Sequence, residues 1–179
     1  MKNFVRAFLL ASTTLCAAQV SLADLPEGLH YMVSPPSCQP ASDADRDRLR
    51  MVNGVWVFRS NVADVTAHLF CPVNFYGNVG VFNNIQLWYK DDFEEHPQSG
   101  FAHFGYVEAI LKARLREDSG WVEIDRVDSN SGPQGYGFVN NFGISGGPET
   151  GEGYFVDVVM WREYATGDVA FAGLAIDIR

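Results

Sequence analysis

Ser145 lies within the glycine-rich run 143–148, and along the chain it follows His68 and the aspartates Asp91 and Asp92. A serine hydroxyl becomes a nucleophile when an imidazole takes its proton and a carboxylate orients that imidazole. Backbone amides of a glycine-rich loop can stabilise the oxyanion that then forms. Residues of these types, in the order His, Asp, Ser, could therefore carry out acyl transfer.

The run from Gly143 to Gly147 resembles the nucleophile loop of trypsin-like serine proteases, and Thr66-Ala67-His68 resembles their histidine motif. The resemblance implies a hydrolase in which Ser145 is the nucleophile, His68 takes its proton, and Asp92, or alternatively Asp91, orients the histidine. However, the 77 residues from His68 to Ser145 are few for the two β-barrels that hold such a triad. An α/β-hydrolase elbow is excluded because the last histidine, His103, precedes the serine. The simpler interpretation places Ser145 in a flexible loop and His68 on a solvated strand.

Acidic and histidine side chains form a second candidate site, a metal site. Six of them cluster within 13 residues: Asp91, Asp92, Glu94, Glu95, His96 and His103. Asp43, Asp45 and Asp47 alternate like the start of a calcium loop, but Arg48 and Gly54 replace the glycine and glutamate that an EF-hand needs. A third oxygen-rich turn, typical of an Asx turn, contains Asp128, Asn130 and Gly132. We expect no metal or other cofactor, with calcium as the alternative that the acidic clusters would suit.

Aromatic residues make up 13% of the chain, and four of them are candidates for a binding surface. Trp88 lies on the opposite side of its strand pattern from the apolar residues around it, and three further rings lie in a glycine-rich segment. Exposed rings can stack on sugar faces or on another protein. We therefore predict Trp88, Tyr136, Phe138 and Phe142 as binding residues.

The elements that must position these residues are strands. From Leu29 onward, short apolar runs of period two alternate with clusters of Gly, Pro, Asn, Asp and Ser. One such run places on the same face Val65, Ala67, Leu69 and Cys71. Two later runs, 154–161 and 169–178, are apolar on both faces, which suits central strands of two packed layers. The pattern predicts one all-β domain, an antiparallel β-sandwich of jelly-roll or Greek-key type.

One segment fits either a strand or a helix. Residues 107–116 alternate as a strand, but their spacing also fits a helix, which their Ala, Leu, Lys and Arg content favours. We predict a strand, because no capping residue precedes them and strand patterns flank them.

The segment 132–153 holds eight of the chain's 17 glycines, so we expect little regular structure there.

The first 23 residues have the pattern of a secretory signal peptide. Lys2 and Arg6 precede the apolar run 7–18, and small residues precede a cleavage site after Ala23. The apolar run is shorter than the roughly 20 residues that a membrane span needs. We expect a single mature domain over 24–179, secreted or periplasmic, with no membrane insertion.

Two cysteines remain after this cleavage, Cys38 and Cys71. An even number in an exported chain favours a disulfide, with two buried free thiols as the alternative. Closing a loop of about 34 residues would stabilise the fold by roughly 3 to 4 kcal/mol.

Removing the signal peptide takes the net charge from −9 to −11. Such a chain repels phosphate backbones, so we expect no nucleic-acid partner.

Several short motifs follow one another along the chain: Asn53-Gly54, Cys71-Pro72, Trp88-Tyr89-Lys90-Asp91-Asp92 and the final run 172–176. Their succession resembles exported bacterial β-sandwich proteins with Asn-Gly, Cys-Pro and aromatic-x-Asp motifs. That group has no assigned activity, so the resemblance implies a fold and export without implying a site. Its members usually carry further cysteines around the later strands, which this chain lacks.

Export, the lack of a coherent catalytic set and the aromatic glycine-rich segment together favour a non-catalytic module. We expect it to bind a glycan, a protein partner or its own copies. Two alternatives stay open. One is the serine protease that uses His68, Asp92 and Ser145, and the other is a structural subunit of an extracellular assembly, which would bury open sheet edges.

Overall fold

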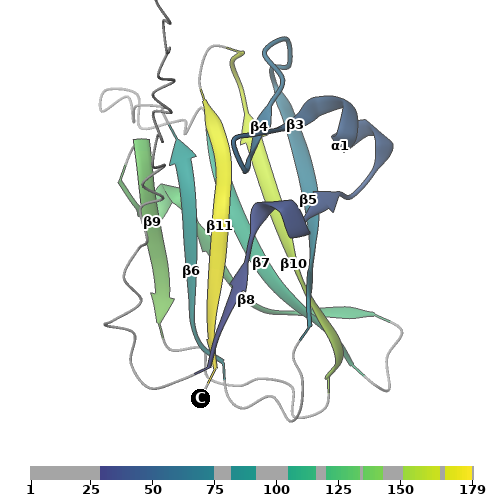
Figure 1. The fold of residues 1–179 in the computed structure, drawn as a ribbon, viewed down its shortest axis with the longest axis vertical. Helices are drawn as coiled ribbons and strands as arrows, with labels where there is room; N and C mark the ends of the chain where they lie inside the picture. The colour runs from purple at the N-terminus through teal and green to yellow at the C-terminus, as the bar shows by residue number, and fades with distance from the viewer. Residues whose placement is uncertain are drawn as a thin grey trace, which may run out of the picture.

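The computed structural model describes residues 29–74, 82–91, 105–115, 120–133, 135–142, 151–165 and 168–178. They form two antiparallel sheets packed face to face, with one short α-helix at the side (Figure 1). The predicted all-β sandwich is therefore confirmed. Within these described ranges, no helix is long and apolar enough to cross a membrane.

Sheet A, the sheet nearer the viewer in Figure 1, has the strand order β3-β4-β11-β6-β9. Its strands are β1 (Leu29–Val33), β3 (Leu49–Val52), β4 (Val55–Phe58), β6 (Phe82–Asp91), β9 (Gly135–Phe142) and β11 (Val169–Ile178). One edge of β11 is shared, since β4 pairs with its first half and β1 with its second half. Between these two stretches lies Gly173, at a positive φ of 141° and at a register shift against β6.

Sheet B has the strand order β2-β5-β10-β7-β8. Its strands are β2 (Gln39–Pro40), β5 (Val65–Val73), β7 (Gly105–Leu115), β8 (Trp121–Asp128) and β10 (Gly151–Arg162). The two sequences that are apolar on both faces form β10 and β11, each central in its sheet, as predicted. Of the ambiguous residues 107–116, all but Arg116, which lies outside the described residues, fall in strand β7, so the strand prediction is confirmed for 107–115.

The core lies between the sheets and follows the period-two patterns. In β5, Ala67, Leu69 and Cys71 are fully buried, while the residues between them are only partly buried. The largest fully buried side chains include Tyr89, Phe82 and Phe171. Each strand therefore gives one set of side chains to the core and leaves the alternate set on an outer face.

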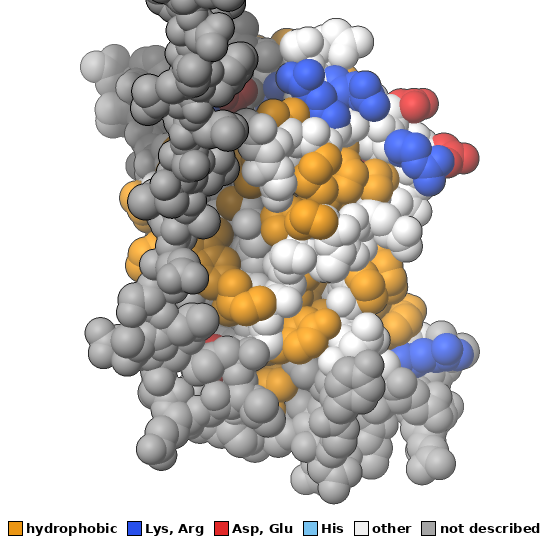
Figure 2. Space-filling view, viewed as in Figure 1, with side chains coloured by type: hydrophobic (Ala, Val, Ile, Leu, Met, Phe, Trp, Pro, Cys, Tyr) orange, Lys and Arg blue, Asp and Glu red, His pale blue; other side chains and the backbone are white. Residues whose placement is uncertain are grey.

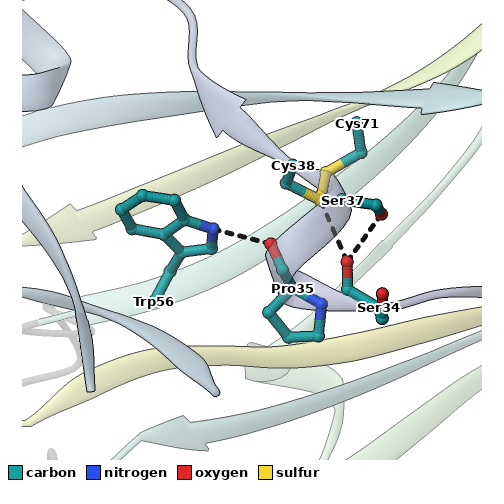
Figure 3. Close-up of a disulfide and its surroundings, with 6 residues drawn as sticks. All are labelled: Ser34, Pro35, Ser37, Cys38, Trp56 and Cys71. Atoms are coloured by element: carbon teal, nitrogen blue, oxygen red, sulfur yellow. Dashed lines mark hydrogen bonds between the residues drawn. A yellow bond between two sulfur atoms is a disulfide. The ribbon is translucent and has the colours of Figure 1, made fainter. Parts of the chain in front are cut away.

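The disulfide predicted between Cys38 and Cys71 is present, with Cα atoms 4.1 Å apart (Figure 3). It lies where the chain leaves β1 in sheet A, passes through the 3-10 turn η1 (Pro35–Ser37) and enters β2 in sheet B. The indole of Trp56 donates to the Pro35 carbonyl at 2.8 Å, which ties β4 to the same turn. The bridge thus fixes a crossing between the two sheets.

The acidic run of residues 43–47 forms a helix, α1 (Asp43–Arg48), which Ser42 caps. Asp45 is buried, and its Oδ1 accepts from the backbone N–H of His68 at 3.2 Å. Arg48 donates to the Thr66 carbonyl at 2.7 Å. The helix therefore covers the edge of β5 beyond the two-residue pairing with β2, which shields backbone groups that an open edge would expose.

One expectation about regular structure is wrong. The glycine-rich segment 132–153 contains strand β9 and the start of β10. Gly132 and Gly137 face the core, where an added Cβ on either would crowd the Tyr89 hydroxyl, so these glycines allow close packing of sheet A. Residues 143–150, which include Ser145, lie outside the described part of the chain.

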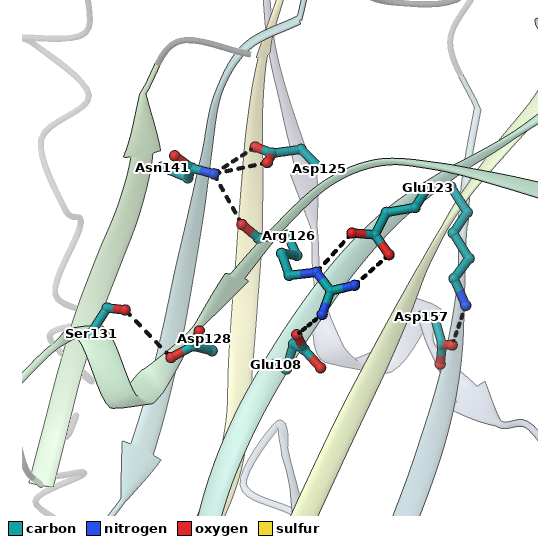
Figure 4. Close-up of polar contacts among 9 residues, drawn as sticks. Glu108, Glu123, Asp125, Arg126, Asp128, Ser131, Asn141 and Asp157 are labelled. Atoms are coloured by element: carbon teal, nitrogen blue, oxygen red, sulfur yellow. Dashed lines mark hydrogen bonds and ion pairs between the residues drawn. The ribbon is translucent and has the colours of Figure 1, made fainter.

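An amide joins the two sheets at the side where β8 and β9 meet (Figure 4). The Asn141 Nδ2 donates to both carboxylate oxygens of Asp125, at 2.8 and 3.0 Å, and to the Arg126 carbonyl at 3.0 Å. Burial raises the pKa of Asp125, while its hydrogen bonds act in the opposite direction. Further along the chain, the turn that the sequence predicted to be of Asx type is the 3-10 turn η2 (Ser129–Ser131), in which the Asp128 side chain makes no capping hydrogen bond and Ser131 donates to Asp128 instead.

Candidate functional site

The outer face of sheet B gathers aromatic and charged side chains from four neighbouring strands. Antiparallel pairing places Asp157 of β10 between Phe70 of β5 and Ile110 of β7, and it places Val159 next to His68. These residues occupy the positions between the core-facing residues of the same strands, so they lie on the outer side of the sheet, although packing among the outer side chains leaves Ile110 and Val159 only 9% and 7% exposed. The face is therefore a continuous surface across β5, β10, β7 and β8.

A ring cluster occupies one end of this face. The rings of Phe70 and Phe155 stack with centroids 4.8 Å apart, and Trp121 meets Phe155 edge to face at 4.5 Å. The Lys112 ammonium lies 5.7 Å from the Phe155 ring centroid. Trp121 remains 47% exposed, so the cluster presents an indole to solvent on a packed aromatic base.

A chain of charged groups crosses the middle of the face. Asp157 forms an ion pair with Lys112 at 2.7 Å and a hydrogen bond with the His68 Nδ1 at 3.1 Å. On the next strands, Arg126 bonds Glu123 through two nitrogens, at 2.6 and 2.7 Å, and Glu108 at 3.1 Å (Figure 4). These hydrogen bonds lower the pKa of Glu123, the bond to Arg126 being the largest cause. The polar groups are held in fixed positions relative to the rings.

A second aromatic pair lies at the opposite end of the face. The rings of Tyr106 and Trp161 are 5.8 Å apart, on directly paired positions of β7 and β10. Burial raises the pKa of Tyr106, and the charges of Glu108 and Asp128 add to this effect. The face thus carries rings at both ends and ion pairs between them.

The structure gives His68 a carboxylate partner that the sequence interpretation did not include. His68 bonds Asp157, whereas Asp91 is buried and accepts a hydrogen bond from Ser129 at 3.1 Å. Asp92 and Ser145 lie outside the described residues. The two-sheet sandwich also differs from the pair of barrels on which trypsin-like proteases hold their triad.

Three of the four predicted binding rings lie together, on the outer face of sheet A. Trp88 of β6 pairs directly with Phe138 of β9, and Tyr136 pairs with Lys90. The backbone of Phe142 continues the same register opposite Asn84, and its side chain lies outside the described part. Tyr136 is 76% exposed and Phe138 is 53% exposed.

A hollow of about 330 Å³ adjoins Tyr136 on this face of sheet A. Lys90 lies 5.3 Å from the Tyr136 ring centroid and pairs with Asp168 at 2.7 Å, and both charged residues line the hollow. Arg50 and valines of β3 and β4 form its other wall. The volume is at the lower end of the range for small-ligand sites.

The metal interpretation has no support in the described ranges, where no group of three His, Cys, Asp or Glu side chains could hold an ion. Of the predicted acidic and histidine cluster, only Asp91 is described, and its carboxylate is engaged by Ser129. The remaining members lie outside the described residues: Asp92, Glu94, Glu95, His96 and His103.

The sequence interpretation missed the sheet B site. It assigned His68 to a solvated strand and gave no role to Phe70, Trp121, Phe155 or Asp157. A signal was present, since the outward positions of antiparallel strands on a solvated sheet face are normally polar, yet several of them hold aromatic residues, Phe70 and Phe155 among them. The sequence did not show which strands pair with one another, so it did not show that these residues lie together.

No family model matches the chain, and no curated protein matches it. Among solved structures it is similar to the low affinity xylan binding module CBM86 from Roseburia intestinalis, with 10% identity, a TM-score of 0.50, and coverage of 85% of this chain and 97% of that module. It is also similar to a family 29 carbohydrate binding module from Piromyces equi (10% identity, TM-score 0.42, coverage 84% and 91%). It is similar as well to a family two carbohydrate esterase from Cellvibrio japonicus, with 12% identity and a TM-score of 0.41. That match covers 84% of this chain but only 33% of the esterase.

Proposed function

We propose that this chain is a non-catalytic glycan-binding module whose site is the outer face of sheet B. The observation that carries the proposal is the half-exposed Trp121 on its base of Phe155 and Phe70, next to the ion-paired Lys112 and Asp157. The likeness in fold to a xylan binding module supports this class of function.

The chemistry of the face matches that of a sugar. One side of a pyranose ring is formed by C–H groups, which pack on a flat aromatic ring, while its hydroxyl groups need donors and acceptors at the rim. Lys112, Asp157 and His68 supply both kinds of group. Their mutual contacts fix them before a ligand arrives, which lowers the entropic cost of binding.

The spacing of the rings indicates a chain rather than a single sugar. Phe155 and Trp161 lie six residues apart on one strand, which is about 20 Å. A ligand that reaches both aromatic ends must therefore span several sugar units. The acidic chain, with a net charge of −9, disfavours polyanionic glycans at long range. We infer that the ligand is an internal stretch of a neutral polysaccharide.

Affinity electrophoresis and calorimetry against xylan, mannan and mixed-linkage glucan test this proposal. We expect binding to at least one of them, and we expect Trp121→Ala to weaken it at least tenfold. Val122→Ala is the matched control, because Val122 is similarly exposed, at 44%, but points to the other side of β8. Unchanged affinity in Trp121→Ala would place the site elsewhere, and lack of binding to every glycan tested would contradict the function.

A further inference from the structure

We propose that the outer face of sheet A is a second glycan-binding site, so that one molecule binds two chains on opposite sides of the sandwich. The proposal takes its ligand class from the proposed function. Its evidence is separate, because it comes from the strands of sheet A, which make no part of the sheet B site.

The first evidence is a strip of exposed rings. Phe138 and Tyr136 project from β9 and remain 53% and 76% exposed, and Trp88 lies next to Phe138 on β6. On the other side of Trp88, β11 has Gly173, where an added Cβ would lie 3.8 Å from the indole. The indole thus lies next to bare backbone on that side, and three large rings share one outer surface, which is unusual unless something covers it.

The second evidence is a pair of amide oxygens beside the rings. Asn84 and Asn140 point to the same outer face, at register positions next to Gln86. Asn84 is only 8% exposed, and its Nδ2 donates to Asp177 at 3.1 Å. The Oδ1 atoms of Asn84 and Asn140 are buried and have no hydrogen-bond partner among the described residues. Buried acceptors are normally satisfied, so these two oxygens are acceptors that a donor from outside the fold can use once neighbouring side chains move to admit it.

The third evidence is the hollow of about 330 Å³ at the other end of the strip. From Asn84 to Lys90, six residues along β6, the distance is about 20 Å. The strip therefore runs from amide acceptors, across the rings, to a concave end. An elongated ligand can use all three parts.

The charge of this face selects a neutral ligand. Figure 2 looks onto it, and in its described part hydrophobic side chains lie across the middle while charged side chains lie mainly at the margins. At the hollow, Asp168 neutralises Lys90, while Arg50 and the buried Arg162 also line its wall, so the remaining positive charge is confined to that end of the strip. Two free acceptors require hydroxyl or N–H donors, and the rings require an apolar C–H face. A neutral sugar offers both, because each of its rings combines a C–H face with hydroxyl donors.

The experiment compares single-face variants with the doubly substituted protein. Phe138→Ala removes a ring from sheet A, Trp121→Ala removes one from sheet B, and Val122→Ala is the control. All three side chains are largely exposed, so the variants should fold, which circular dichroism and thermal unfolding would verify. For each protein we would measure retention on a glycan gel, and cross-linking of the soluble glycan by light scattering.

The second site predicts that wild type and Val122→Ala cross-link the glycan at high protein concentration. Each single variant should remain retained on the gel, Trp121→Ala more weakly because only the weaker sheet A site is left, and each should show at least tenfold lower cross-linking. The double variant should lose both retention and cross-linking. A wild type that is retained but never cross-links, or a Phe138→Ala variant that cross-links normally, overturns the second site and leaves the proposed function intact. Loss of all retention in Phe138→Ala alone shows that sheet A is the one site, which overturns the two-site proposal. Absence of glycan binding in the wild type overturns both proposals.

Discussion

At the scale of single residues, Gly132 shows how closely the core is packed. A Cβ at this position would overlap the Tyr89 hydroxyl and a Val139 methyl group, both in the core. We predict that Gly132→Ala lowers the free energy of unfolding by about 1 to 3 kcal/mol, as overpacking does. The control is Gly120→Ala, since no atom lies within 4 Å of a Cβ there. Urea unfolding measures both, and equal stability of the two variants would contradict the prediction.

We predict that the titration of Tyr89 lowers the free energy of unfolding at alkaline pH. Burial, with smaller contributions from Asp91 and Asp128, raises its pKa to about 12, and its hydroxyl donates to the Pro133 carbonyl at 2.7 Å. In the unfolded chain the phenol titrates near pH 10, so between about pH 10 and 12 only the unfolded state loses this proton. The free energy of unfolding should therefore fall as pH rises through that window. Urea unfolding at several alkaline pH values should show a smaller decline in Tyr89→Phe, and parallel declines would show that other groups are responsible.

At the scale of elements, helix α1 protects the edge of β5 through one buried carboxylate. Asp45 accepts from the His68 N–H, so Asp45→Ala leaves a partly buried amide unpaired, and we predict a loss of about 1 to 3 kcal/mol. Asp43 lies on the same helix, but its ion pair with Arg46 is exposed, so Asp43→Ala should change stability by less than about 1 kcal/mol. Thermal unfolding distinguishes the two variants. A larger effect at Asp43 would mean that the helix dipole, rather than the strand edge, determines the role of these acids.

Strands also explain why aromatic residues from distant parts of the sequence form surfaces. β6 and β9 pair directly, which brings Trp88 next to Phe138, and β10 pairs with β5 and β7, which brings Asp157 next to His68 and Lys112. Each contact joins residues at least 45 positions apart. A strand by itself specifies which residues point outward, but only its neighbours specify what those residues meet.

At the scale of the whole molecule, export remains a prediction from the N-terminal pattern. We expect cleavage between Ala23 and Asp24, and mass spectrometry of protein recovered outside the cytoplasm should show an N-terminus at Asp24. Ala23→Arg should block this processing, because signal peptidase requires a small residue at that position. An intact Met1 in the exported protein would refute the signal-peptide interpretation. The disulfide between Cys38 and Cys71 agrees with an oxidising compartment.

The sequence by itself determined the class of the fold. Period-two patterns specify which face of β5 is buried, runs that are apolar on both faces identify β10 and β11 as central, and two cysteines allow one disulfide. These features are local, because a strand's side chains alternate whatever its partners are. The same alternation placed Trp88 outside the core, whereas Tyr136 and Phe138 were selected because they lie in the glycine-rich segment that was expected to be irregular.

Only the tertiary structure decided where chemistry can occur. The glycine-rich segment 132–153 was expected to be irregular, yet pairing with β6 makes part of it the strand β9, because strand formation depends on neighbours more than on intrinsic preference. In the same way, the sequence offered Asp92 for His68, whereas sheet order placed Asp157 there. Long-range pairing sets the register between strands, and no local pattern encodes that register.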